Sequence, residues 1–136
     1  MKATLTIPVS PGELADKLTI LEIKQERVAD PARRASAIHE YRLLHKIWRA
    51  ADVETSEIAR LKDQLRAVNE RLWRIEDEIR AHEARAEFDE RFIELARDVY
   101  RHNDWRSELK NKINELLGSE LAEVKQYTVY PTADGG

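Results

Sequence analysis

The feature that most restricts the fold is a series of apolar side chains that recur every three or four residues. The first series consists of Ile58, Leu61, Leu65, Val68, Leu72, Ile75 and Ile79, and the next position at the same spacing is His82. A second series consists of Phe88, Phe92, Leu95 and Val99, and it resumes at Leu109, Ile113 and Leu116. This spacing places each series along one face of an α-helix. The sequence therefore predicts two long helices with coiled-coil spacing, joined by a turn near residues 85–89.

The short turn favours an antiparallel arrangement of these two helices. A long helix that pairs with a second copy is the alternative. In a parallel pair Glu78 and Glu83 would face each other, which disfavours that arrangement. We therefore predict an all-α helical bundle built on a long antiparallel helical hairpin, and keep a homodimer as the alternative assembly.

Two further helices are predicted before the hairpin. Ser10 can cap the first, with Pro11 at its first position and Glu13 completing a capping box. Asp30 can cap the second helix, which extends to about residue 51. Gly118 is expected to end the last helix, because glycine readily adopts the left-handed conformation there.

The two ends of the chain have the alternating pattern of strands. Residues 3–9 alternate apolar and polar side chains, and residues 124–130 are rich in β-branched and aromatic types. We therefore expect that the ends could pair as a short terminal β-ribbon. Residues 1–132 are predicted to form a single helical domain, and residues 133–136 a frayed tail.

Composition excludes several classes of function. The chain has 136 residues, of which 36% are charged, and no cysteine, so it has no disulfide or thiolate metal site. Its net charge of −3 does not suggest a general polyanion binder. No apolar run approaches the roughly 20 residues of a membrane span, and no signal peptide is recognised at the N-terminus. We predict a cytoplasmic protein without a membrane segment.

The second hairpin helix carries polar residues where its spacing calls for leucine. His102 and Arg106 occupy these positions. A buried, unpaired guanidinium costs several kcal/mol, so Arg106 needs an acidic partner, a ligand or access to water. The acidic partners considered are Glu70, Glu76, Asp77 and Asp104.

Three interpretations of this polar break remain open. In the first, Asn103 and Asp104 end one helix and cap another, so that the break is a kink. In the second, His102 and Arg106 fix the register of the hairpin as buried polar residues do in coiled coils. In the third, the break is a ligand or catalytic site.

The second predicted helix is basic on one face, formed by His39, Arg42, Lys46 and Arg49. We favour docking of this face against an acidic helix. Nucleic-acid binding ranks third among the functions considered, because no aromatic residues interleave with the basic ones. Trp73 and Trp105 lie off the hairpin seam, so the first two helices or another subunit must cover them.

No cofactor or metal motif is recognised. The chain contains neither Glu-x-x-His nor His-Glu-x-x-His, its four histidines are scattered, and no phosphate-binding glycine loop is present. We therefore predict no cofactor and no metal site.

Three stretches resemble an uncharacterised bacterial domain family of unknown function: IPVSPGELADKLTILEIKQER, LWRIEDEIR and FIELARDVYRHNDWRSELKNKINELLGSELAEVKQY. The resemblance covers nearly the whole chain and implies a family without a known activity. It also implies a link to glycan and surface-polysaccharide pathways. The polar motif positions here include Glu13, Asp16, Lys17, Lys24, Trp73, Glu76, Asp77, Asn103, Asp104, Arg106 and Lys110.

We expect these polar residues to converge where the first helix crosses the hairpin. The candidate ligand-binding residues are Lys17, Trp73, Glu76, His102, Asn103, Asp104, Arg106 and Lys110. The function predicted first is a non-catalytic helical interaction or accessory protein with a protein partner. The alternative is a small helical enzyme or binding protein for an anionic metabolite, with a polar pocket around Arg106.

Overall fold

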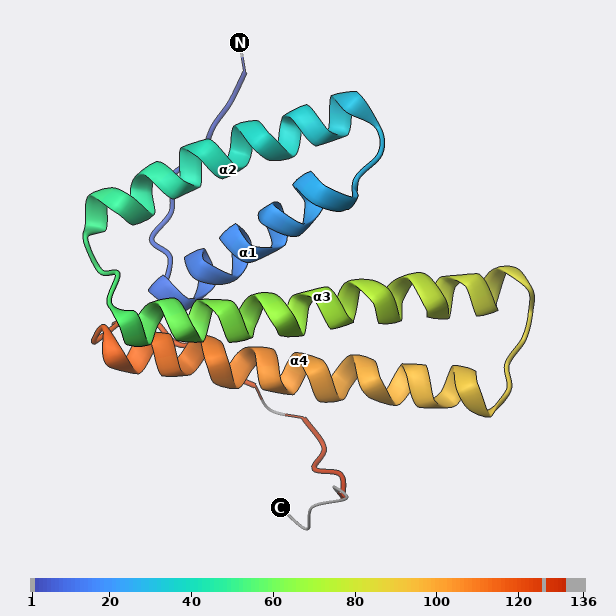
Figure 1. Ribbon diagram of the computed structural model, residues 1–136. Coiled ribbons are helices and arrows are strands. Elements are labelled where there is room, and N and C mark those ends of the chain that lie inside the picture. The colour runs from blue at the N-terminus through green and yellow to red at the C-terminus, as the bar shows by residue number, and fades with distance from the viewer. Residues whose placement is uncertain (1, 126, 132–136) are drawn as a thin grey trace.

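The computed structural model describes residues 2–125 and 127–131, and these residues form a bundle of four α-helices (Figure 1). The helices are α1 (Pro11–Arg27), α2 (Pro31–Ala51), α3 (Ser56–Ala84) and α4 (Glu90–Leu116). α3 and α4 form the predicted antiparallel hairpin, α1 packs on it, and α2 lies on the far side of α1. The all-α prediction is confirmed. Within the described ranges, no helix is both long and apolar enough to cross a membrane.

Each helix begins with a side chain that accepts a backbone N–H. Ser10 caps α1 at 3.1 Å and Asp30 caps α2 at 2.9 Å. Thr55 caps α3 at 3.1 Å and Asp89 caps α4 at 3.0 Å. These bonds satisfy N–H groups that the first helical turn leaves without a partner. Gly118, with φ of 62°, follows α4 as the sequence predicted.

The main core lies where α1 meets the first half of the hairpin. It consists of Leu14, Ala15, Leu18, Trp48, Ile58, Leu61, Leu65 and Ile113. Trp48 is the contribution of α2, and its indole Nε1–H donates to Glu54 at 2.6 Å. The Lys62 ammonium lies 4.7 Å from the centre of the same ring. α2 is therefore attached along α1 and, at its C-terminal end, to the start of α3.

α4 is one uninterrupted helix through the polar break. The interpretation that Asn103 and Asp104 end one helix and start another is therefore wrong. The apolar residues on either side of the break, Leu95 and Ile113, are fully buried. The ends of the seam, Phe88 and Leu116, are about half exposed.

The predicted terminal β-ribbon does not form among the residues that the structure describes, because they contain no strand. Residues 2–9 are exposed, and Leu5 and Ile7 are 87% and 73% accessible. The two terminal segments leave the bundle on opposite sides, next to α2 and next to α4 (Figure 1). The alternating pattern therefore has no pairing partner within the described chain. The tail predicted to fray, residues 133–136, lies outside the described residues.

Candidate functional site

The polar break in α4 is explained by an acidic partner on α1. The Arg106 Nε–H donates to Asp16 Oδ1 at 2.8 Å, and a terminal N–H of the same guanidinium donates to Asp16 Oδ2. Such two-pronged pairs are among the stronger hydrogen bonds in proteins. The Asp16 side chain is 1% exposed and that of Arg106 is 29% exposed. The sequence prediction of a partner on α3 or α4 was wrong.

Two further side chains complete the surroundings of Asp16. The Asn69 amide, on α3, donates to Asp16 Oδ1 and to the Thr19 hydroxyl, both at 2.9 Å. The Thr19 hydroxyl donates to the backbone oxygen of Asp16 at 2.8 Å. One buried carboxylate therefore joins α1 to both helices of the hairpin. A buried charge is stable only with such partners.

A second ion pair lies one turn along α4. The Lys110 ammonium is 2.6 Å from a Glu13 carboxylate oxygen and 3.1 Å from one of Glu123, in the segment after α4. Burial lowers the pKa of Lys110, but the hydrogen bonds with Glu13 and Glu123 outweigh it, so the pKa is raised. The hydrogen bond with Asp16 is the largest cause of the raised pKa of Arg106. Both cations are held in their charged form by partners within the chain.

A backbone contact between α1 and α4 brings these groups together. The Gly12 N–H donates to Asn114 Oδ1 at 2.7 Å. A Cβ atom at position 12 would lie 2.2 Å from the Lys110 backbone oxygen. Only glycine allows this close approach without displacing α4. We use the term interhelix cluster for these residues: Gly12, Glu13, Asp16, Thr19, Asn69, Arg106, Lys110 and Asn114.

The segment after α4 closes the cluster on one side. Asn111 forms two hydrogen bonds with the Glu123 backbone, accepting its N–H at 2.9 Å and donating to its oxygen at 3.0 Å. The Tyr130 hydroxyl donates to Asp104 Oδ2 at 2.5 Å, and its ring packs edge-on against Tyr100. These contacts hold the Glu123 carboxylate next to Lys110.

Comparison with known proteins places the cluster within a family. Residues 5–134 match the model of a family of unknown function, DUF6165. The chain belongs to this family. The match confirms the resemblance to an uncharacterised domain family and includes every residue of the interhelix cluster. Searches of curated proteins and of solved structures each gave no match.

The structure brings together three of the candidate residues of this DUF6165 chain. Arg106 and Lys110 belong to the interhelix cluster, and Asn103 lies at its edge, where its side-chain oxygen is 3.5 Å from the Arg106 guanidinium. Asp104 binds the C-terminal segment instead. The His102 Nδ1 lies 2.8 Å from the Asp98 backbone oxygen.

The other three candidates lie elsewhere on the helices. Lys17 is exposed on α1, and Trp73 is half-buried on α3, one turn beyond Asn69. Glu76 pairs with Arg80 on its own helix at 3.6 Å. α1 therefore meets the polar break through Glu13 and Asp16, which were among the residues expected to converge, whereas Lys17, Trp73 and Glu76 lie outside the cluster.

A separate charged surface covers the outer side of α2. We use the term α2 basic face for Arg42, Lys46 and Arg49, which are all exposed. Beside it lie Leu43 and Ile47, which are 51% and 56% exposed. A shallow hollow along this helix is lined by Tyr41, Arg42, His45, Lys46, Arg49 and Ala50. The expected acidic helix is not found in contact with this face within residues 2–125 and 127–131.

Proposed function

We propose that this protein is a non-catalytic interaction protein whose α2 basic face binds an acidic helix of another protein. α2 carries five Lys and Arg side chains and a single acid, Glu40. Among the described residues, none of these five cations forms an ion pair, and this observation carries the proposal. The accessory role in surface-polysaccharide pathways implied by the family resemblance is part of the same proposal.

Some arginines of the hairpin, in contrast, form ion pairs with carboxylates of the chain. Arg66 on α3 donates to Glu22 and Glu26 of α1, both at 2.7 Å. Arg91 on α4 forms a two-pronged pair with Glu78 at 2.9 and 2.7 Å. Clustered cations without internal partners attract an acidic partner over a distance and set its orientation.

The neighbouring apolar residues favour a helix over a nucleic acid as the partner. Leu43 and Ile47 are four residues apart on one face of α2, the spacing that meets an amphipathic helix. The aromatic residues of α2 point inward: Trp48 is 3% exposed, and the Tyr41 hydroxyl donates to Glu22 of α1 at 3.3 Å. Tyr41 and His45 line the hollow on this helix, but their rings stack on each other, with centroids 5.2 Å apart. This stacking leaves less aromatic surface for bases than a row of separate exposed rings would.

The alternative, an anionic metabolite bound at Arg106, receives less support. The Arg106 guanidinium is already paired with Asp16, and the Lys110 ammonium is paired with Glu13 and Glu123. An incoming anion would have to displace a carboxylate that is almost fully buried. Such a displacement leaves a buried charge without its partner, which costs about 3–5 kcal/mol.

The test measures binding of a labelled acidic amphipathic peptide, with glutamates on one helical face and leucines on the other, by fluorescence anisotropy. The variant Arg42→Ala/Lys46→Ala/Arg49→Ala removes the α2 basic face. The matched control Arg60→Ala/Arg71→Ala/Arg74→Ala removes three exposed cations from α3. A second variant, Leu43→Ser/Ile47→Ser, removes the apolar residues beside the face.

We expect the wild type and the α3 control to bind the peptide equally. The α2 basic-face variant and the Leu43→Ser/Ile47→Ser variant should each bind at least tenfold more weakly. Equal binding by all variants, or no binding by the wild type, would contradict the proposal. Tighter binding of a single-stranded RNA of matched charge would favour nucleic-acid binding instead.

A further inference from the structure

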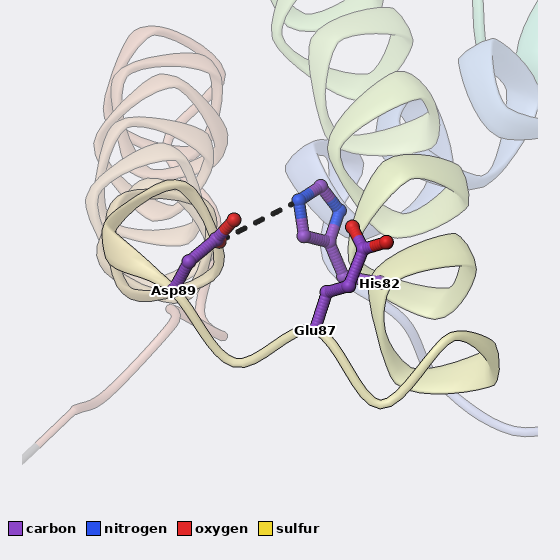
Figure 2. A group of neighbouring side chains, drawn as sticks. All are labelled: His82, Glu87 and Asp89. Carbon is purple, nitrogen blue, oxygen red and sulfur yellow. Dashed lines mark ion pairs between the residues drawn. The ribbon is translucent and has the colours of Figure 1, made fainter.

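The turn between α3 and α4 brings together three side chains able to bind a metal ion (Figure 2). His82 comes from the last turn of α3, Glu87 from the connection, and Asp89 from the N-cap of α4. One donor atom from each residue lies within 4.8 Å of the other two. The His82 Nε2 is 3.7 Å from Asp89 Oδ1. This group is distinct from the interhelix cluster and from the α2 basic face.

The imidazole of His82 is oriented as metal-binding histidines usually are. His82 is 6% exposed, and its Nδ1 lies 3.0 Å from the backbone oxygen of Glu78. Because a carbonyl oxygen only accepts, Nδ1 carries the hydrogen and donates it. In the neutral ring this arrangement leaves the lone pair on Nε2. Figure 2 shows the ring turned toward the Asp89 carboxylate. A backbone hydrogen bond on the other ring nitrogen fixes the orientation of many metal ligands.

The two carboxylates differ in the contacts that hold them. Asp89 Oδ1 accepts the Phe92 N–H at 3.0 Å as the cap of α4, and the same oxygen lies 3.7 Å from His82 Nε2. The Glu87 backbone is fixed, because its N–H donates to the His82 oxygen at 3.0 Å. The Glu87 side chain is exposed and lies 3.1 Å from the Arg85 Nε. A metal ion would compete with Arg85 for this carboxylate.

We propose that His82, Glu87 and Asp89 form a binding site for a divalent transition-metal ion, with zinc as the leading candidate. One imidazole nitrogen and two carboxylate oxygens suit zinc, whose bonds to these atoms are about 2.0–2.2 Å long. Tetrahedral ligands at that distance lie roughly 3.3–3.6 Å apart. The separation of 3.7 Å between His82 and Asp89 is close to this value, and the exposed Glu87 side chain closes the set by rotation. Water would occupy the fourth position.

The bound ion would join the last turn of α3 to the first turn of α4. This end of the hairpin lies beyond the part of the hairpin that α1 covers (Figure 1). Its other cross-links include the pair of Arg91 with Glu78 and the contact of the Phe92 and His82 rings, 6.5 Å apart. The bound metal would therefore stabilise the closed turn.

The test uses tag-free protein and two measurements. Zinc binding is followed by isothermal titration calorimetry, and Co²⁺ binding by its visible absorption in a coordinated site. The test variants are Glu87→Gln and Glu87→Gln/Asp89→Asn, because asparagine retains the helix cap while weakening the metal ligand. The matched control, Glu83→Gln, removes one exposed carboxylate from the same region without touching the three donors.

We expect one zinc ion per chain in the wild type and in Glu83→Gln. Binding should weaken at least tenfold in Glu87→Gln and be undetectable in the double variant, with helical content by circular dichroism unchanged. The Co²⁺ absorption should follow the same order. An absence of zinc binding by the wild type, equal binding by the double variant, or an equal loss in Glu83→Gln would overturn the proposal. These outcomes leave His82 and Asp89 as an ion pair of the turn.

Discussion

α1 and α2 are neighbouring helices that use their charged residues in opposite ways. On α1, Glu13 and Asp16 point into the bundle and bind cations of α4. On α2, Arg42, Lys46 and Arg49 face outward, without ion pairs among the described residues. The difference follows from position, because α1 contacts all three other helices, whereas α2 packs along α1 and reaches the start of α3 at its C-terminal end. A charged residue type therefore does not by itself distinguish a packing role from a binding role.

The motif residues of α1 hold this helix in place against the hairpin. Glycine at position 12 permits the close approach to α4, and Asp16 joins α1 to α3 and α4. Buried polar networks of this kind can specify one arrangement of helices in place of several. The exposed surface of α2 is free of that constraint, and there we expect the partner.

Among the substitutions considered, we expect Arg106→Ala to lower the stability of the protein most. The substitution leaves the buried Asp16 carboxylate with only its neutral hydrogen-bond donors, so we expect the free energy of unfolding to fall by about 3 kcal/mol. Urea denaturation followed by circular dichroism measures the change. Arg71→Ala, which removes an exposed α3 cation, should change it by less than about 0.5 kcal/mol. Equal losses of unfolding free energy for the two substitutions would mean that the interhelix cluster contributes no more to stability than an exposed cation does.

We expect a smaller loss of stability against unfolding for Gly12→Ala. Helix propensity alone predicts that alanine stabilises by about 1 kcal/mol. The new methyl group would meet the Lys110 backbone, however, so we expect a net destabilisation of about 2 kcal/mol from overpacking. The thermal unfolding midpoint decides between the two signs, with Ser36→Ala on exposed α2 as the control. A raised midpoint in Gly12→Ala would show that α1 does not approach α4 closely.

Lys110→Met should have a moderate effect that depends on pH. The folded-state pKa of Lys110 is raised above its ordinary value of 10.5, so its stabilising effect is complete below that pH. This effect is lost as pH rises through the folded-state value. We expect the variant to be about 1–2 kcal/mol less stable near pH 7, with a difference from wild type that narrows above pH 10.5. A difference that is constant across this range would mean that Lys110 acts through packing alone.

The smallest effect on stability is expected for the α2 basic face. Arg42→Ala/Lys46→Ala/Arg49→Ala removes exposed cations from a helix with excess positive charge, so stability should change by less than about 1 kcal/mol in total. Thermal unfolding at low and high salt measures this change. A loss as large as that of Arg106→Ala would show that the face supports the fold and would remove the case for a free docking surface.

Much of the fold could be predicted from the sequence because periodicity and caps act locally. The hairpin, the start of α2 at Asp30 and the stop at Gly118 all depend on neighbouring residues. The partner of Arg106 could not be predicted, because Asp16 is 90 residues away and the hairpin register says nothing of how α1 crosses it. The terminal ribbon, which the sequence offered as a possibility, is absent from the described residues, because alternation shows a preference for pairing without supplying a partner.

Only part of the candidate site could be predicted, because only residues on one helix can be grouped from their spacing. Arg106 and Lys110 share a face of α4 by helical spacing, so their grouping could be predicted. The group of His82, Glu87 and Asp89 matches no common motif spacing, and it forms only when the turn closes. The family match adds no activity to either site.

The most direct test of the account is a double-mutant cycle on the free energy of unfolding with Asp16→Asn, Arg106→Gln and their combination. The account predicts a coupling energy of about 2 kcal/mol or more, because each single variant leaves one member of a largely buried pair behind. A coupling energy below about 0.5 kcal/mol would contradict it, since the two residues would then stabilise the protein independently and the interhelix cluster would not fix α1 on the hairpin.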